Sequence, residues 1–251
     1  METKDLWGFI NFGTGLRYLQ DVQQYSVHGD SFVLENINRF MKAIEVLNLH
    51  VTKRASQELE EIQKQLAKKP KNARLTSVEA ERIRNIIKDI RKTLCAETKG
   101  NFVYMISDKR MDVNKLMNSV DKLFAPNILN KCPEIARYDF QEAGKCISFE
   151  RPTAAAFHLM RGTEAVLRLY HKNFIRSNIN NRNWGTIINE LRSKNRGKIP
   201  DETLINNLDN LRHSFRNPTQ HPDKIYDIDE VQDLFGICID VVNRMISAIK
   251  K

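Results

Sequence analysis

Apolar residues recur at helical spacing through most of this chain, and this periodicity limits its fold more than any other feature. In residues 31–47, in residues 204–215 and after Asp227, the apolar positions are mostly three or four residues apart, which is the spacing of one helical face. Glycine and proline number only 10 and 7 in 251 residues, too few for the many turns of a sandwich or barrel. The sequence therefore predicts an all-α protein.

The first half of the chain, residues 1–130, is expected to be a mostly helical region. Helices are predicted over residues 31–47 and 56–67. A third helix is expected to begin at Thr76, because Thr76 and Glu79 have the spacing of a capping box. A short apolar run at residues 102–106 is compatible with a strand.

Two segments of this first half resemble binding elements. Phe12-Gly13-Thr14-Gly15 is similar to part of a glycine-rich phosphate loop, but no Lys-Ser, Lys-Thr or third glycine follows. We interpret it as a turn before a short helix.

The third helix is strongly basic. Its cations could follow a phosphate backbone or simply form the solvated face of an amphipathic helix. These cations are Arg82, Arg84, Lys88, Arg91 and Lys92.

A connector with two prolines, residues 125–133, separates this region from a more regular pattern. We place a domain boundary there, which gives units of residues 1–130 and 131–251. Five helices in the second unit predict an up-down helical bundle. Three of them cover residues 133–148, 152–174 and 183–193, the fourth is capped by Asp201, and the fifth is capped by Asp227.

Charge and cysteine usage narrow the class of protein. The net charge of +9 favours a polyanionic partner such as nucleic acid. The four cysteines contain no Cys-x-x-Cys pair, so we expect reduced, mostly buried thiols and neither disulfides nor a zinc site. No apolar run is long enough to span a membrane and no signal segment starts the chain, so the expected location is the cytoplasm.

The segment Arg216-Asn217-Pro218-Thr219-Gln220-His221 lies in a short break between two patterned helices. Arginine can hold a phosphate with a permanently charged fork, and histidine can exchange a proton near neutral pH. Pro218 and Pro222 disfavour helical geometry at the residues before them. We thus expect the preceding helix to end near Arg216 and His221 to lie in an extended turn. The two side chains could then converge on one ligand atom. The alternative is that both residues have structural roles. The arginine would interact favourably with the negative end of the helix dipole, and the histidine would hydrogen-bond to a loop carbonyl.

The helix that begins at Pro152 carries a polar stripe beside its apolar face. Its members recur every three or four residues and could border a cleft or form a surface ladder of ion pairs; they are His158, Arg161, Glu164, Arg168 and His171. Metal binding is disfavoured, because His213, His221 and Asp223 lack the regular spacing of metal ligands. No metal or other cofactor is expected.

The Arg216-Asn217-x-x-x-His221 pattern, just before the last helix of a small α-bundle, resembles the HEPN superfamily of nucleotide-binding domains. The segment from Phe149 to Arg168 is also similar to an earlier helix of bacterial members. The resemblance covers residues 133–251 and implies a metal-independent endoribonuclease, often a toxin or anti-phage defence effector. It also implies a homodimer with two motifs facing one cleft, and RNA as the substrate.

The resemblance assigns catalytic positions to Arg216 and His221, with Asn217 as the polar residue after the arginine. We expect His221 to act as general acid or base and Arg216 to stabilise charge on the phosphorane. Residues expected to contact substrate are Arg212, Arg161, Glu164, Arg168 and His158. Two rival functions stay open: a non-catalytic module that binds nucleic acid or a nucleotide, and an antitoxin-like or sensor subunit that pairs with a partner protein.

Overall fold

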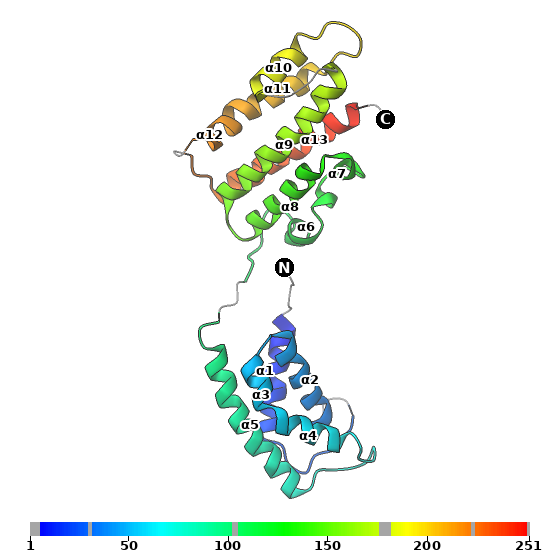
Figure 1. The fold of residues 1–251 in the computed structure, drawn as a ribbon, viewed down its shortest axis with the longest axis vertical. Helices are drawn as coiled ribbons and strands as arrows, with labels where there is room; N and C mark the ends of the chain where they lie inside the picture. Colours follow the sequence, from blue (N-terminus) through cyan, green and yellow to red (C-terminus); the bar gives the residue numbers. More distant parts are fainter. Residues whose placement is uncertain (1–5, 30–31, 102–104, 176–181, 222–223, 250–251) are drawn as a thin grey trace. The chain divides into compact units, whose positions relative to one another are not determined.

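The computed structural model of the chain describes residues 6–29, 32–101, 105–175, 182–221 and 224–249 (Figure 1). These residues form helices joined by loops, with one isolated antiparallel bridge between Ser26 and Arg74. The all-α prediction is confirmed. Of the run at residues 102–106, only Met105 and Ile106 are described, and they lie in a loop; residues 102–104 of the expected strand lie outside the described residues.

The chain divides into two compact units, Met1–Val103 and Tyr104–Lys251, and each closes its own apolar core. The boundary expected near residue 130 therefore moves upstream. The physical reason is that helix α6 (Val113–Asn118), a 3-10 turn (Val120–Leu123) and α7 (Ile128–Lys131) bury apolar side chains in the core of the second unit.

The first unit contains five helices in its described residues (Figure 1): α1 (Leu6–Gln20), α2 (Val33–Val46), α3 (His50–Ala55), α4 (Gln57–Leu66) and α5 (Ser77–Thr98). The expected capping box is present, with Thr76 Oγ1 accepting from the Glu79 N–H and Glu79 accepting from the Thr76 N–H. At the other end of α5, the Glu97 carboxylate accepts hydrogen bonds from the N–H groups of Val51 and Thr52, which caps α3.

The prediction of a turn at residues 12–15 is wrong, because these residues lie within α1. Phe12 stacks on Phe40 of α2, with ring centroids 5.4 Å apart. Gly15 faces Asn36 of α2, and a Cβ there would lie only 3.1 Å from the Asn36 side-chain oxygen. The glycine therefore serves close helix packing, which is compatible with a helical backbone.

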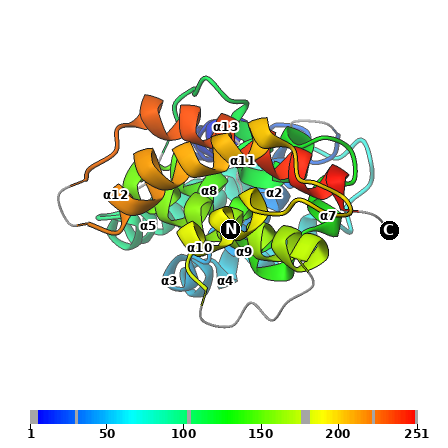
Figure 2. The same cartoon turned by 90° about the horizontal axis from the view of Figure 1, so that it is seen from above.

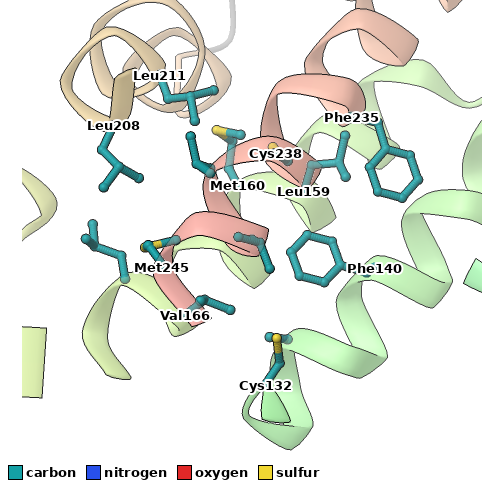
Figure 3. Packing of buried hydrophobic residues seen from close by; sticks show 14 of the residues in the cluster. Cys132, Phe140, Leu159, Met160, Val166, Leu208, Leu211, Phe235, Cys238 and Met245 are labelled. Carbon is teal, nitrogen blue, oxygen red and sulfur yellow. The ribbon is translucent and has the colours of Figure 1, made fainter. Parts of the chain in front are cut away.

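The second unit is built around α8 (Glu134–Ser148), α9 (Pro152–Ile175) and α13 (Ile228–Ala248). Their apolar faces meet in one core, in which Phe140, Leu159 and Phe235 lie close together (Figure 3). Helix α10 (Trp184–Arg192) packs on α9, and α11 (Glu202–Leu211) lies beside α13 (Figure 2). The up-down order of this bundle stays a prediction.

The helix that carries the motif does not end at Arg216. Helix α11 continues through a π-helical turn, Arg212–Arg216, into α12 (Asn217–Thr219). Asn217 keeps helical dihedral angles, φ −65° and ψ −51°, so the expected loss of helical geometry before Pro218 is wrong. Proline lacks an N–H and its ring crowds the carbonyl four residues earlier. The widened turn directly before Pro218 relieves that crowding, and the helix continues to Thr219.

Candidate active site

A cavity of about 320 Å³ lies between the first half of α9 and the end of the motif helix. It opens at the surface, where Phe157 and Arg161 are exposed. Its lining combines cationic, anionic and titratable side chains from two elements: Phe157, His158, Met160, Arg161, Glu164, Arg216 and Gln220. The cavity therefore gathers four of the residues that the sequence singled out.

Arg216 is the last residue of the π turn, and it lines the cavity. Its Nη2 lies 3.7 Å from the Glu164 carboxylate, and 28% of its side chain is exposed. The distance is long for a hydrogen bond, so this is a loose ion pair. An anionic ligand could therefore compete for the guanidinium.

Asp139 of α8 is the organising group beneath the cavity, and its side chain has no exposed surface. Arg161 donates to it twice, from Nε to Oδ2 at 2.7 Å and from Nη2 to Oδ1 at 2.6 Å. The His158 Nδ1 lies 2.8 Å from the same Oδ1. A buried carboxylate needs such partners to remain charged, and here it fixes the position of two cavity residues.

The close approach of α8 and α9 depends on Gly162. A Cβ at this position would lie 3.2 Å from the Asp139 Cβ and 3.3 Å from the Phe140 ring. Because Gly162 has no side chain, α8 can come near enough for Asp139 to reach Arg161 and His158. The hydrogen bond to Asp139 is the main cause of a raised pKa for Arg161, opposed by partial burial.

Glu164 is shared between two arginines. Its Oε1 lies 2.7 Å from Nη2 of Arg168, one helical turn further along α9, while Oε2 faces Arg216. Arg168 also donates to the backbone carbonyl of Arg182 at 2.9 Å. Arg168 therefore positions Glu164 and does not line the cavity.

The polar stripe of α9 divides at this point into two kinds of contact. His158, Arg161 and Glu164 border the cavity, as a cleft interpretation requires. His171 is buried instead, with Nε2 2.6 Å from the Glu190 carboxylate of α10. The far half of the stripe thus connects α9 to neighbouring elements, through the hydrogen bond from Arg168 to the Arg182 carbonyl and the contact between His171 and Glu190.

Arg212 faces a different part of the unit. Its Nε donates to Asp209 at 3.0 Å, and its guanidinium passes directly over Gly185 of α10. Burial raises the pKa of the Asp209 carboxyl, but hydrogen bonding and charge from Arg192 and Arg212 outweigh it and lower that pKa. Arg212 thus connects α11 with α10 and is not among the cavity residues.

His221 and Asn217 do not line the cavity, although each directly follows a lining residue in the chain. His221 is exposed just after α12, and its N–H donates to the Pro218 carbonyl at 2.9 Å. Gln220, its chain neighbour, is a cavity residue. The convergence of Arg216 and His221 on one ligand stays a prediction.

Several cations of the basic helix α5 are used within the first unit. Arg82 pairs with Glu58 at 2.9 Å, and Arg84 donates to the Val22 carbonyl at 2.6 Å. Lys92 pairs with Asp89 at 2.8 Å. These contacts support the interpretation of α5 as a solvated amphipathic helix.

Larger hollows exist in both units, but they lack a histidine. One of about 820 Å³ is lined by residues of α1, of the segment that follows it and of α5, including Arg17, Asp21 and Arg84. Another, of about 970 Å³, lies near the end of α9 and is lined by Lys172, Lys194 and Lys198 among others. The smaller cavity at Arg216 is the better candidate, because it combines an imidazole, a carboxylate and two guanidiniums.

Sequence reasoning missed Asp139, the residue on which the site's geometry depends. A signal was present, since Asp139 lies between Ala136, Phe140 and Ala143 on the buried face of α8. A carboxylate in such a position requires charged or hydrogen-bonding partners. The sequence could not identify them, because they come from another helix.

Within the described ranges, no group of three or more His, Cys, Asp or Glu side chains is arranged to hold a metal ion. In the same ranges, no helix has both the length and the apolar character needed to cross a bilayer. Comparisons with models of known protein families, with curated protein sequences and with solved structures return no match.

Proposed function

We propose that this chain is a metal-independent endoribonuclease of the HEPN type, acting at the cavity between α9 and the motif helix. One observation carries the proposal: Arg216 of the motif shares a cavity with a second guanidinium, Arg161, and with an imidazole, His158. Two planar cations and a proton-exchanging group suit a phosphodiester. The net charge of +9 is consistent with a polyanionic substrate.

The reaction needs no metal because RNA carries its own nucleophile. A base removes the proton of the ribose 2′-hydroxyl, and the oxygen attacks the adjacent phosphorus. The bond from phosphorus to the 5′ oxygen breaks, and that oxygen receives a proton. The products are a 2′,3′-cyclic phosphate and a free 5′-hydroxyl. DNA lacks the 2′-hydroxyl and is expected to remain intact.

Arg216 and His221 have separate roles in this proposal. Arg216 stabilises the additional negative charge of the phosphorane, which develops only in the transition state. His221 exchanges a proton with the 2′-hydroxyl. Asn217, on the adjoining turn, is proposed to orient the phosphate. Removal of one such charge-stabilising donor typically slows catalysis about 10²–10³-fold.

The test is digestion of single-stranded RNA in excess chelator by wild type, Arg216→Ala and His221→Ala. Arg244→Ala is a matched control, because Arg244 is an exposed arginine of α13 that pairs with Asp240 at 3.0 Å and does not line the cavity. The control should cleave like wild type, whereas the two motif variants should lose about 10²-fold or more. Equal cleavage by all four proteins would refute the proposal.

A binding module without catalysis is the second candidate, and one observation favours it. In the part of the chain that the structure describes, no side-chain hydrogen bond holds the His221 ring, which is exposed. A general base is usually oriented by a partner. Binding of RNA that Arg216→Ala weakens, with no product at any time, would select this function.

The resemblance also implies a homodimer and a role as a toxin or defence effector, and we include both in the proposal. Light scattering of the purified chain tests the first. For the second, expression in a bacterial host should arrest growth, and His221→Ala should relieve the arrest. A stable complex with a partner protein and no dependence on His221 would instead favour an interaction subunit.

A further inference from the structure

The contact between Asp139 and His158 has the geometry of a carboxylate that orients a proton-transferring histidine. The carboxylate is fully buried, its oxygen lies 2.8 Å from Nδ1, and the imidazole is 26% exposed in the cavity that holds Arg216. We propose that His158 is a second catalytic residue, the general acid that protonates the departing 5′ oxygen. This inference rests on the ribonuclease function proposed above.

The hydrogen-bond partners determine which nitrogen is available. An ionised carboxylate can only accept, so the Nδ1 facing Asp139 carries a proton. The other nitrogen, Nε2, is then the one that exchanges protons with a ligand. In the protonated imidazole, Nδ1–H keeps its bond to Asp139 while Nε2–H is donated to the leaving oxygen.

Asp139 is a positioning residue in this scheme and does not itself transfer a proton. Both of its oxygens accept from Arg161 as well, and an arginine stays protonated throughout. The charged groups around His158 are Asp139 from α8, Arg161 and Glu164 from α9, and Arg216 from the motif helix. The Tyr138 ring meets the imidazole edge-on, with centroids 6.4 Å apart.

Two histidines would thus divide the proton transfers of the reaction. His221 removes the proton from the 2′-hydroxyl, and His158 gives one to the 5′ oxygen as its bond to phosphorus breaks. One proton enters and one leaves the enzyme, so each turnover leaves the pair of imidazoles with the same total number of protons. Water exchange then restores the original state of each ring.

The experiment compares RNA with a substrate whose scissile 5′ bridging oxygen is replaced by sulfur. A thiolate leaves without protonation, so this substrate needs no general acid. The variant is His158→Asn, because an asparagine amide places an N–H near the position of Nδ1 and can keep the bond to Asp139 without a titratable group. Circular dichroism and urea unfolding verify its fold, and His158→Gln is the alternative if His158→Asn is unstable.

On ordinary RNA we expect His158→Asn to lose about 10²–10⁴-fold in rate, and on the sulfur-bridged substrate to cleave within about tenfold of wild type. His221→Ala should be slow on both substrates. If His158→Asn cleaves ordinary RNA at the wild-type rate, or is equally slow on both substrates, the inference is overturned while the proposed function stands. If wild type cleaves neither substrate, both are overturned.

Discussion

The Asp139 carboxylate and the Arg161 guanidinium form a two-point ion pair that joins α8 to α9, with N–O distances of 2.7 and 2.6 Å. The two partners are unequally exposed, because Asp139 is fully buried whereas 58% of the Arg161 side chain is accessible to water. The cost of breaking the pair therefore depends on which partner is removed.

Arg161→Leu should be more destabilising than Asp139→Asn. The first change leaves a buried carboxylate with His158 as its remaining side-chain partner, which typically costs about 3–5 kcal/mol. The second leaves a guanidinium that water can solvate, and we expect a loss of about 1–2 kcal/mol. Urea unfolding at pH 7 measures both.

The double variant provides the control for this pair. Because the two groups interact directly, Arg161→Leu combined with Asp139→Asn should cost less than the sum of the single changes. Strictly additive losses would show that the ion pair contributes nothing specific.

Glycine-to-alanine changes should have opposite effects at different helix positions. At Gly144 of α8 a new Cβ would collide with the Leu116 carbonyl of α6, a backbone atom that cannot move away easily, so we expect a loss of about 1–3 kcal/mol. At Gly236 of α13 no described atom lies within 4 Å of the added Cβ.

Gly236→Ala is therefore the matched control, and it should stabilise the second unit by about 0.5–1 kcal/mol, because alanine loses less backbone entropy in a helix. Gly162→Ala tests the site itself. Its Cβ would press on Asp139 at 3.2 Å, so RNA cleavage should fall even if the unit stays folded. Unchanged activity would show that the spacing of α8 and α9 is not critical.

Thiol labelling should separate the four cysteines by burial. Cys95 is exposed, whereas burial raises the pKa of Cys132 and of Cys238 from 9.0 to about 12. At pH 8 their thiolate fractions are then about 10³-fold lower than that of an ordinary thiol. A colorimetric disulfide reagent should find one fast thiol in the native protein.

Cys146 should react more slowly than Cys95, because burial also raises its pKa, with the Glu142 charge as a smaller cause. Cys132 and Cys238 should react only after unfolding. In Cys95→Ser the fast phase should disappear. If one of the other thiols still reacted fast in that variant, the packing of the core would be contradicted.

Glu79 should make the first unit less stable in acid. Burial raises the pKa of this carboxyl, but hydrogen bonds from Lys69 and Thr76 outweigh it, and the folded-state pKa lies below 4.5. A carboxyl with a lowered folded pKa contributes its stability above the unfolded pKa, and that contribution is lost as pH falls through the folded value.

Glu79→Gln keeps the shape of the capping box but removes the charge. We expect about 1 kcal/mol less stability at pH 7, with the gap closing below about pH 4. Hydrogen exchange of the α5 amides, compared between variant and wild type at each pH, measures the difference. A gap that persists in acid would assign the effect to side-chain shape.

Helix starts in this chain could be predicted where the sequence supplies a local cap. Thr76, Asn183, Asp201 and Asp227 each accept a hydrogen bond from the N–H of the residue three positions later, and the helices begin at Ser77, Trp184, Glu202 and Ile228. This chemistry acts within one turn and needs no tertiary contact.

Other features depend on contacts between distant residues and could not be predicted. Helix α1 contains three glycines, and one of them, Gly15, packs on α2. The partners of Asp139 lie 19 and 22 residues further along the chain, a distance over which periodicity gives no pairing. Arg216 lines the cavity and Arg212 does not, and this division depends on helix geometry that no local pattern revealed.

The π turn at Arg212–Arg216 changes the angle between these two arginines. In a regular α-helix, residues four apart lie on one face, since each residue turns the chain by about 100°. A π turn closes over five residues, so each residue turns the chain by only about 80°. Relative to Arg212, the π turn therefore rotates Arg216 by about 80° from its place in a regular helix, and Arg216 faces α9 whereas Arg212 faces α10. Deleting one residue such as Ser214 would leave three steps of a regular helix, about 300° in total, against about 320° across the π turn. Homologues that differ by a single gap here would thus change the spacing of the two arginines and keep the direction in which the motif's arginine points.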